Sequence, residues 1–140
     1  MPPEELRPVV VDTDAFSFAY LPARPEGGQG WRDRLFGRTI AIAVQTAVKL
    51  RSGARMRNWG TRRMDELESR LEAVQIVPVT ETVQAGYIDI TVWARSNGHA
   101  IQQRDHVADR WIAATAMAWD LELASGDGIF DGINGLRRLP

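Results

Sequence analysis

The stretch PVVVDTDAF, residues 8–16, decides how the fold begins. Three consecutive β-branched residues follow a proline and lead into two carboxylates, a pattern typical of a short buried strand. We therefore predict a strand over Val9–Val11 that carries Asp12 at its carboxyl end. A helix is expected directly afterwards, over residues 15–20.

The rest of the chain alternates strand patterns with helix patterns. Strand patterns occur at TIAIAV (39–44), QIVPV (75–79), LELAS (121–125) and GLRRL (135–139). Helix patterns occur at 31–37, 45–53, 59–74, 80–98 and 106–121. Thr80 is expected as an N-cap, and Gly53 and Gly98 are expected to end their helices. Residues 22–30 are predicted to form a flexible loop. Such alternation implies parallel strands joined by right-handed crossovers. We predict an α/β fold, a three-layer α/β/α sandwich with a mostly parallel sheet, as one domain over 1–140 with a core at about 8–139 and a tail at 1–7.

The composition excludes several classes of protein. The chain has 140 residues, a net charge of −1, no cysteine and two histidines. Without cysteine there is no disulfide framework and no thiol nucleophile, so any metal must be held by oxygen or imidazole. We interpret His99 and His106 as surface or helix-start residues. No apolar run reaches the roughly 20 residues of a membrane helix, and the acidic start MPPEELRP is unlike a signal peptide, so we expect a cytoplasmic protein with no membrane partner.

Three acids are expected to meet at one edge of the sheet. Ligands of parallel α/β sheets bind beyond the carboxyl ends of the strands, where Asp12 and Asp127 stand. Asp109 shares a helix face with small apolar residues that turn toward the sheet. Each acid has a simpler interpretation, as a cap, a turn residue or half of a salt bridge. Together they favour a site for a hard cation, Mg²⁺ or Mn²⁺.

Four segments together resemble the signature segments of a known family. VVVDTDAF, TAVKLRSGA, HVADRWIAATA and LELASGDGIFD resemble, in this order and spacing, those of PIN domains, specifically the VapC-type toxins of bacterial toxin–antitoxin pairs. The resemblance implies a Mg²⁺-dependent endoribonuclease in which Asp12, Asp109 and Asp127 bind the metal and Asp14 and Ser125 support them. It also implies a cognate antitoxin as partner, RNA as substrate and a homodimer.

Lys49 departs from the pattern of this family. It is the only lysine in a chain with sixteen arginines, and it falls on the family's fourth acid, normally glutamate. We interpret it as an inactivating Glu→Lys change, natural or introduced; the alternative is that this homologue carries lysine natively. An ammonium there opposes Mg²⁺ binding and can itself pair with Asp12 or Asp109. The chain as written is therefore expected to bind Mg²⁺ poorly and to cut RNA weakly or not at all.

Two surfaces are candidates for partners. A basic run just after the Lys49 helix is interpreted as an RNA-binding patch with Trp59 available to stack on a base, or else as an ordinary solvated surface. Its arginines are Arg51, Arg55, Arg57, Arg62 and Arg63. Aromatic residues of the first half are expected either to form a groove for an antitoxin segment or to belong to the core. These are Phe16, Phe18, Tyr20, Trp31 and Phe36.

Two other functions stay open on the sequence alone. VVVDTDAF also resembles the first motif of haloacid-dehalogenase phosphatases, although Phe16 stands where that motif has threonine or valine. The chain could instead be a catalytically silent PIN-like module that binds antitoxin or RNA. Lys49 gives weight to this second alternative.

Overall fold

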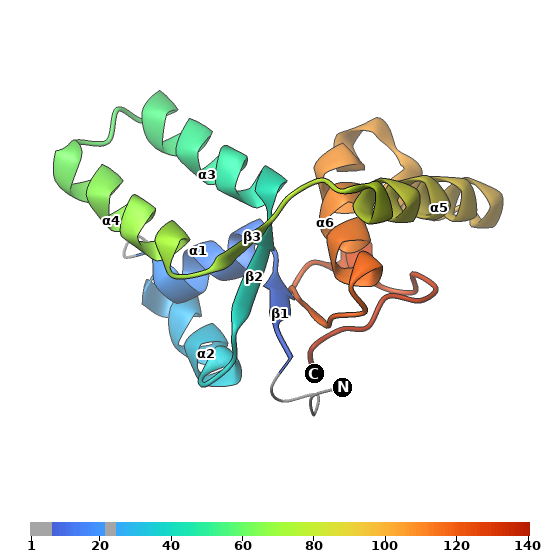
Figure 1. Ribbon diagram of the computed structural model, residues 1–140, viewed down its shortest axis with the longest axis horizontal. Helices are drawn as coiled ribbons and strands as arrows, with labels where there is room; N and C mark the ends of the chain where they lie inside the picture. The colour runs from blue at the N-terminus through green and yellow to red at the C-terminus, as the bar shows by residue number, and fades with distance from the viewer. Residues whose placement is uncertain (1–6, 22–24) are drawn as a thin grey trace.

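The protein is described from a computed structural model, which covers residues 7–21 and 25–140 (Figure 1). Within them, four parallel strands form one sheet in the order β3-β2-β1-β4. The strands are β1 (Val9–Val11), β2 (Ile40–Ala43), β3 (Gln75–Val77) and β4 (Leu123–Ala124). The α-helices are α1 (Thr13–Tyr20), α2 (Pro25–Leu35), α3 (Val44–Met56), α4 (Thr61–Glu72), α5 (Glu81–Asn97) and α6 (Val107–Ala118). Short 3-10 turns are η2 (Ala100–Gln102), η3 (Arg104–His106) and η4 (Gly128–Phe130).

The two central strands are buried on both faces. Every residue of β1 and β2 is buried, which explains why both read as continuous apolar runs instead of alternating patterns. Val9 and Val11 pack on one side, with Ile40 and Ile42, while Val10 packs on the other with Ala41 and Ala43. The sheet therefore needs a layer of helices on each face.

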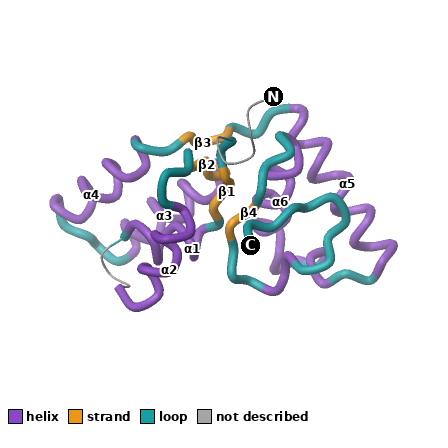
Figure 2. Tube along the Cα trace, turned by 90° about the horizontal axis from the view of Figure 1, so that it is seen from below, coloured by secondary structure: helices purple, strands orange, loops and turns teal. Residues whose placement is uncertain are grey.

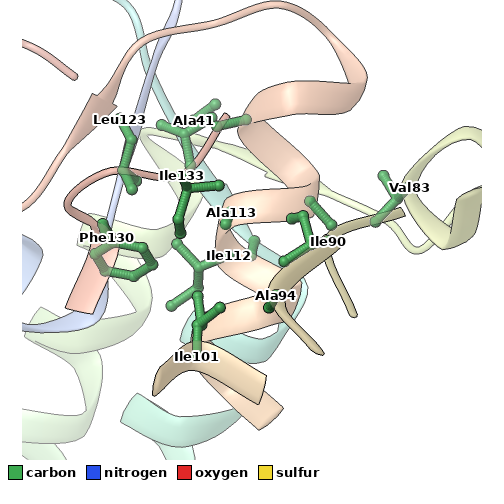
Figure 3. Close-up of a cluster of buried hydrophobic side chains, with 14 residues drawn as sticks. Ala41, Val83, Ile90, Ala94, Ile101, Ile112, Ala113, Leu123, Phe130 and Ile133 are labelled. Carbon is green, nitrogen blue, oxygen red and sulfur yellow. The ribbon is translucent and has the colours of Figure 1, made fainter. Parts of the chain in front are cut away.

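The helices divide between the two faces of the sheet. Seen along the sheet, α1–α4 lie on one side and α5 and α6 on the other (Figure 2). The α5–α6 side holds a buried cluster in which Ile90, Ile112 and Leu123 meet (Figure 3). The opposite cluster joins Phe16, Leu67 and Leu71 to the sheet. The predicted three-layer α/β/α sandwich is thus confirmed.

Small residues let α5 and α6 approach closely. A Cβ built on Gly86 of α5 would lie 3.3 Å from the carbonyl oxygen of Ala114 on α6. The ring of Tyr87 stacks on Trp111 across the same contact, with centroids 4.0 Å apart. α5 begins and ends as predicted, because the Thr80 hydroxyl caps its first turn and Gly98 adopts φ +64° at its end.

Three local expectations were wrong. Residues 25–30, predicted as loop, belong to α2; residues 22–24 of that loop lie outside the described residues. α3 runs past Gly53 to Met56, because a glycine within a helix costs only about 1 kcal/mol, which packing can override. GLRRL forms a single bridge between Leu123 and Arg138 instead of a strand. Among the described helices, none combines the length and apolar character needed to cross a membrane.

Candidate active site

A small hollow lies at the carboxyl edge of the sheet, where β1 and β4 end between α3 and α6. Its volume is about 190 Å³. It is lined by Asp12, Thr13, Asp14, Gln45, Lys49, Ala108, Asp109, Ile112 and Asp127. Aspartates that follow two different strands and an aspartate from α6 therefore face the same small space, together with residue 49. We call this space the carboxylate hollow.

Asp12 is the most buried acid of the hollow, with 5% of its surface exposed. Its Oδ1 accepts a hydrogen bond from the backbone N–H of Ala15 at 2.8 Å and so caps α1. Its Oδ2 accepts a hydrogen bond from the Ser125 hydroxyl at 2.5 Å. Burial raises the pKa of Asp12 above the ordinary 3.8, while the hydrogen bonds from Ser125 and Ala15 act in the opposite direction. The capping interpretation of Asp12 is correct, and the same carboxylate also lines the hollow.

Ser125 links the ends of β1 and β4. Besides donating to Asp12, its hydroxyl oxygen accepts a hydrogen bond from the backbone N–H of Asp127 at 3.0 Å. Asp127 in turn caps η4, since its Oδ1 accepts from the backbone N–H of Ile129 at 3.0 Å. The turn-residue interpretation of Asp127 is therefore also correct. Ser125 orients one acid through its side chain and positions the backbone of the other.

Asp109 lies in the first turn of α6 with 26% of its side chain exposed. Its Oδ2 is 2.8 Å from Nδ1 of His106. The neighbouring Arg110 is 6% exposed, and its guanidinium donates to the carbonyl of Ile101 and the hydroxyl of Tyr87. His106 and Arg110 thus hold Asp109 and the turn before it in place. Sequence reasoning assigned neither to the site, although a histidine three residues before an acid at a helix start is a recognisable signal.

Lys49 and Gln45 line the hollow from successive turns of α3. Lys49 is exposed, and no described acid lies within ion-pair distance of its ammonium. The suggested pairing with Asp12 or Asp109 is therefore not found among the described side chains. Gln45 was missed from the sequence. Its Oε1 is buried without a hydrogen-bond partner.

The hollow in this chain does not fit a divalent cation. Its carboxylate and amide oxygens are the donor type that Mg²⁺ prefers. However, Lys49 adds a positive charge to the lining. Within residues 7–21 and 25–140, no three acidic or histidine side chains are gathered closely enough to hold a metal ion. These observations count against tight Mg²⁺ or Mn²⁺ binding by the chain as written.

The basic run after Lys49 is split between two surfaces. Arg51 makes a two-pronged ion pair with Glu68 at 2.9 Å, which ties α3 to α4. Arg55 lies with Arg51 on that face of α3. Arg57 and Trp59 instead line a depression that adjoins the hollow. Of the patch predicted to bind RNA, only Arg57 and Trp59 therefore line the depression next to the carboxylate hollow.

The aromatic residues of the first half do not form one groove. Phe16 is fully buried in the core, whereas Phe36 is 89% exposed. Tyr20 lines a wide groove of about 1090 Å³ between α1, α2 and α4. Charged and polar residues make up much of that groove, among them Arg32, Asp65 and Arg70.

The parallel sheet, with its carboxyl edge ringed by acids, has the architecture of a PIN-like domain, and comparisons with known proteins agree. No protein-family model matches the sequence. The chain is 30% identical over 126 residues to Toxin FitB of Neisseria gonorrhoeae (strain ATCC 700825 / FA 1090), covering 85% of this chain and 87% of that protein. This chain belongs to the family of Toxin FitB, the VapC-type PIN-domain toxins.

Solved structures support the same fold. The crystal structure of FitAcB from Neisseria gonorrhoeae superposes with a TM-score of 0.74 at 27% identity, covering 94% of this chain and 96% of that one. VapBC2 from Rickettsia felis, bound to a DNA fragment from its promoter, gives a TM-score of 0.76 at 17% identity, covering 94% of this chain and 97% of that one. The haloacid-dehalogenase interpretation finds no support in these comparisons.

Proposed function

We propose that this chain is the toxin component of a toxin–antitoxin pair, and that its carboxylate hollow is a Mg²⁺-dependent endoribonuclease centre silenced by Lys49. The observation that carries the proposal is the lining of the hollow. Asp12, Asp109 and Asp127 come from distant segments, and Lys49 lines the same space at the position where the resemblance expects glutamate. Belonging to a family of toxins that are generally nucleases supports the proposal.

The surrounding residues suit such a centre. With glutamate at position 49, Asp12, Asp109 and Asp127 would be the residues to hold a divalent ion, which would supply charge neutralisation at a phosphate and an activated water. Hydrogen bonds from Ser125 to Asp12 and between His106 and Asp109 restrain the acids, as supporting residues do around metal ligands. The exposed Asp14 gives the hollow a further acid. What the chain lacks is an acid at position 49.

The test is an RNA-cleavage assay with Mg²⁺ on three proteins: the chain as written, Lys49→Glu, and Lys49→Glu combined with Asp12→Ala. We expect cleavage by Lys49→Glu alone. The Asp12→Ala change in the third protein controls for a contaminating nuclease. Equal cleavage by all three proteins, or none by any, would refute the proposal.

We further propose an antitoxin as the protein partner. The support is that a similar solved structure, with a TM-score of 0.65 at 20% identity, is a toxin–antitoxin complex from Klebsiella pneumoniae. The groove between α1, α2 and α4, at about 1090 Å³, is large enough for a peptide segment. Co-purification of the chain with a candidate antitoxin tests this, and Arg70→Glu within the groove is expected to weaken the complex.

A homodimer is also proposed. Ile88 and Val92, one turn apart on α5, are 60% and 61% exposed, which suits a self-association surface. Light scattering of the chain and of an Ile88→Lys variant tests it. We expect a dimeric mass for the chain as written and a monomeric mass for the variant.

The second candidate function is a catalytically silent module that binds antitoxin or RNA. It is favoured by the same lysine, because an ammonium in the hollow removes the cation site without disturbing the fold. Binding of antitoxin by a Lys49→Glu variant that still fails to cleave RNA would select this candidate over the nuclease.

A further inference from the structure

A second depression continues from the carboxylate hollow between α1 and α3. Its volume is about 290 Å³. It is lined by Thr13, Asp14, Ser17, Leu21, Lys49, Leu50, Gly53, Met56, Arg57 and Trp59, and we call it the Trp59 groove. Thr13, Asp14 and Lys49 line both spaces. The two spaces are therefore neighbours, with Lys49 at their junction.

We propose that the Trp59 groove binds one nucleotide of single-stranded RNA without any metal ion. Lys49 and Arg57 contact its phosphates, and Trp59 contacts its base. Lys49 thus takes over the phosphate-binding role of a cation while blocking the cation's own site. This inference rests on the proposed function, because that function makes RNA the ligand class.

The linings of the groove and the hollow differ in net charge. The hollow contains four aspartates and one cation, Lys49, so it repels a phosphate when no metal is present. The groove contains one acid, Asp14, and two cations, Lys49 and Arg57. A phosphate is therefore attracted to the groove side of Lys49.

The two cations of the groove are free to bind a ligand. Arg51 is occupied by Glu68, and the guanidinium of Arg63 lies 4.4 Å from the Trp59 ring centroid. By contrast, neither Lys49 nor Arg57 forms an ion pair with any residue in the described part of the chain. A phosphate at the groove thus need not compete with an internal carboxylate for them.

The size and lining of the groove favour a nucleotide over a protein segment. A volume of about 290 Å³ is at the small end of ligand pockets, which begin near about 300 Å³. A helix about 10 Å in diameter needs more room, such as the groove between α1, α2 and α4. Arg63 covers one face of the Trp59 ring, so the part of Trp59 that lines the groove, together with the 78% exposed Met56, offers apolar contact to an unstacked base. A duplex keeps its bases stacked and cannot make this contact.

The experiment measures fluorescence anisotropy of a labelled single-stranded RNA decamer of mixed sequence in EDTA. An RNA duplex of the same sequence serves as the comparison probe. We expect the chain as written to bind the single-stranded RNA at least about tenfold more tightly than the duplex. Two phosphate contacts predict a slope of log K against log salt of about −1.4, and Lys49→Gln or Arg57→Ala should each bring it to about −0.7.

Further variants separate the contacts from one another. Arg95→Ala, which removes an exposed arginine from α5 on the other side of the sheet, is the matched control and should change neither affinity nor slope. Lys49→Glu should lose binding in EDTA. Thermal melting of each variant identifies any loss of fold.

Four results would overturn the inference. The first three are no binding of single-stranded RNA in EDTA, duplex binding as tight as single-stranded binding, and equal weakening by Arg57→Ala and Arg95→Ala. The fourth is RNA binding that neither Arg57→Ala nor Lys49→Gln weakens, which would leave the groove for a protein partner. Cleavage by Lys49→Glu in Mg²⁺ is a separate measurement, so the proposed function can fail while the EDTA result stands, or the reverse.

Discussion

Replacing Lys49 by glutamate should restore metal affinity by an amount that the size of the hollow allows us to estimate. A hollow of about 190 Å³ is about 7 Å across if spherical, and over that distance a divalent ion and a unit charge interact by about 2.4 kcal/mol at an effective dielectric of about 40. The substitution changes the local charge by two units, or about 4.7 kcal/mol before screening. At physiological ionic strength the Debye length is about 8 Å, so screening leaves about 0.4 of this interaction energy, or about 2 kcal/mol.

We therefore expect Lys49→Glu to bind Mn²⁺ or Mg²⁺ at least about thirtyfold more tightly than the chain as written. Lys49→Gln removes only the positive charge and should gain about fivefold. Direct coordination of the metal by the new carboxylate would increase the gain of Lys49→Glu but not that of Lys49→Gln. The assay is isothermal titration of Mn²⁺ at physiological salt, with metal-induced change in melting temperature as an independent measure. Equal dissociation constants for all three proteins would show that residue 49 does not control the site.

Three further substitutions test the fold around the hollow. Asp12→Asn should have a higher melting temperature than the parent at neutral pH and the same melting temperature near about pH 3. Burial raises the pKa of Asp12, so the folded state is penalised only above the ordinary 3.8, where the carboxyl of the unfolded chain is charged. Thermal melts at a series of pH values measure this. Arg110→Met should lower the free energy of unfolding by about 2–3 kcal/mol in urea, since it removes the hydrogen bond to the buried Ile101 carbonyl and a part-buried bond to Gln103, whereas Arg95→Met should change it by less than about 0.5 kcal/mol. Gly86→Ala should cost about 1–2 kcal/mol in the same assay, because its Cβ meets the Ala114 carbonyl.

Local chemistry explains which elements could be predicted. Val9–Val11 and the IAIA strand were recognisable because central parallel strands are apolar throughout. Thr80 and Gly98 marked the ends of α5 through contacts within a few residues. The first half of α2, residues 25–30, was predicted as loop because it contains three glycines, and nothing local reveals that the helix extends back from its buried Leu35.

Part of the candidate site could be predicted from the sequence, and part of it could not. The rule that ligands bind at the carboxyl edge of a parallel sheet, together with the resemblance to PIN domains, selected Asp12, Asp109, Asp127 and Lys49. Supporting contacts such as the bond from Ser125 to Asp12 join residues 113 positions apart, and no local pattern encodes which oxygen faces which donor. The unpaired Lys49 and the unsatisfied Gln45 likewise became apparent only when α3 was set against its neighbours.

The sequence by itself determined the order of strands and helices along the chain and the aspartates that follow the strands. It could do so because helix and strand propensity, capping and the spacing of apolar residues act over a few residues. Only the tertiary structure decided that Lys49 borders two spaces of opposite charge and that Arg51 is taken up by Glu68 while Arg57 is not. Such distinctions depend on distances between elements remote in the chain, which the packing of α3 against α1 and α4 sets.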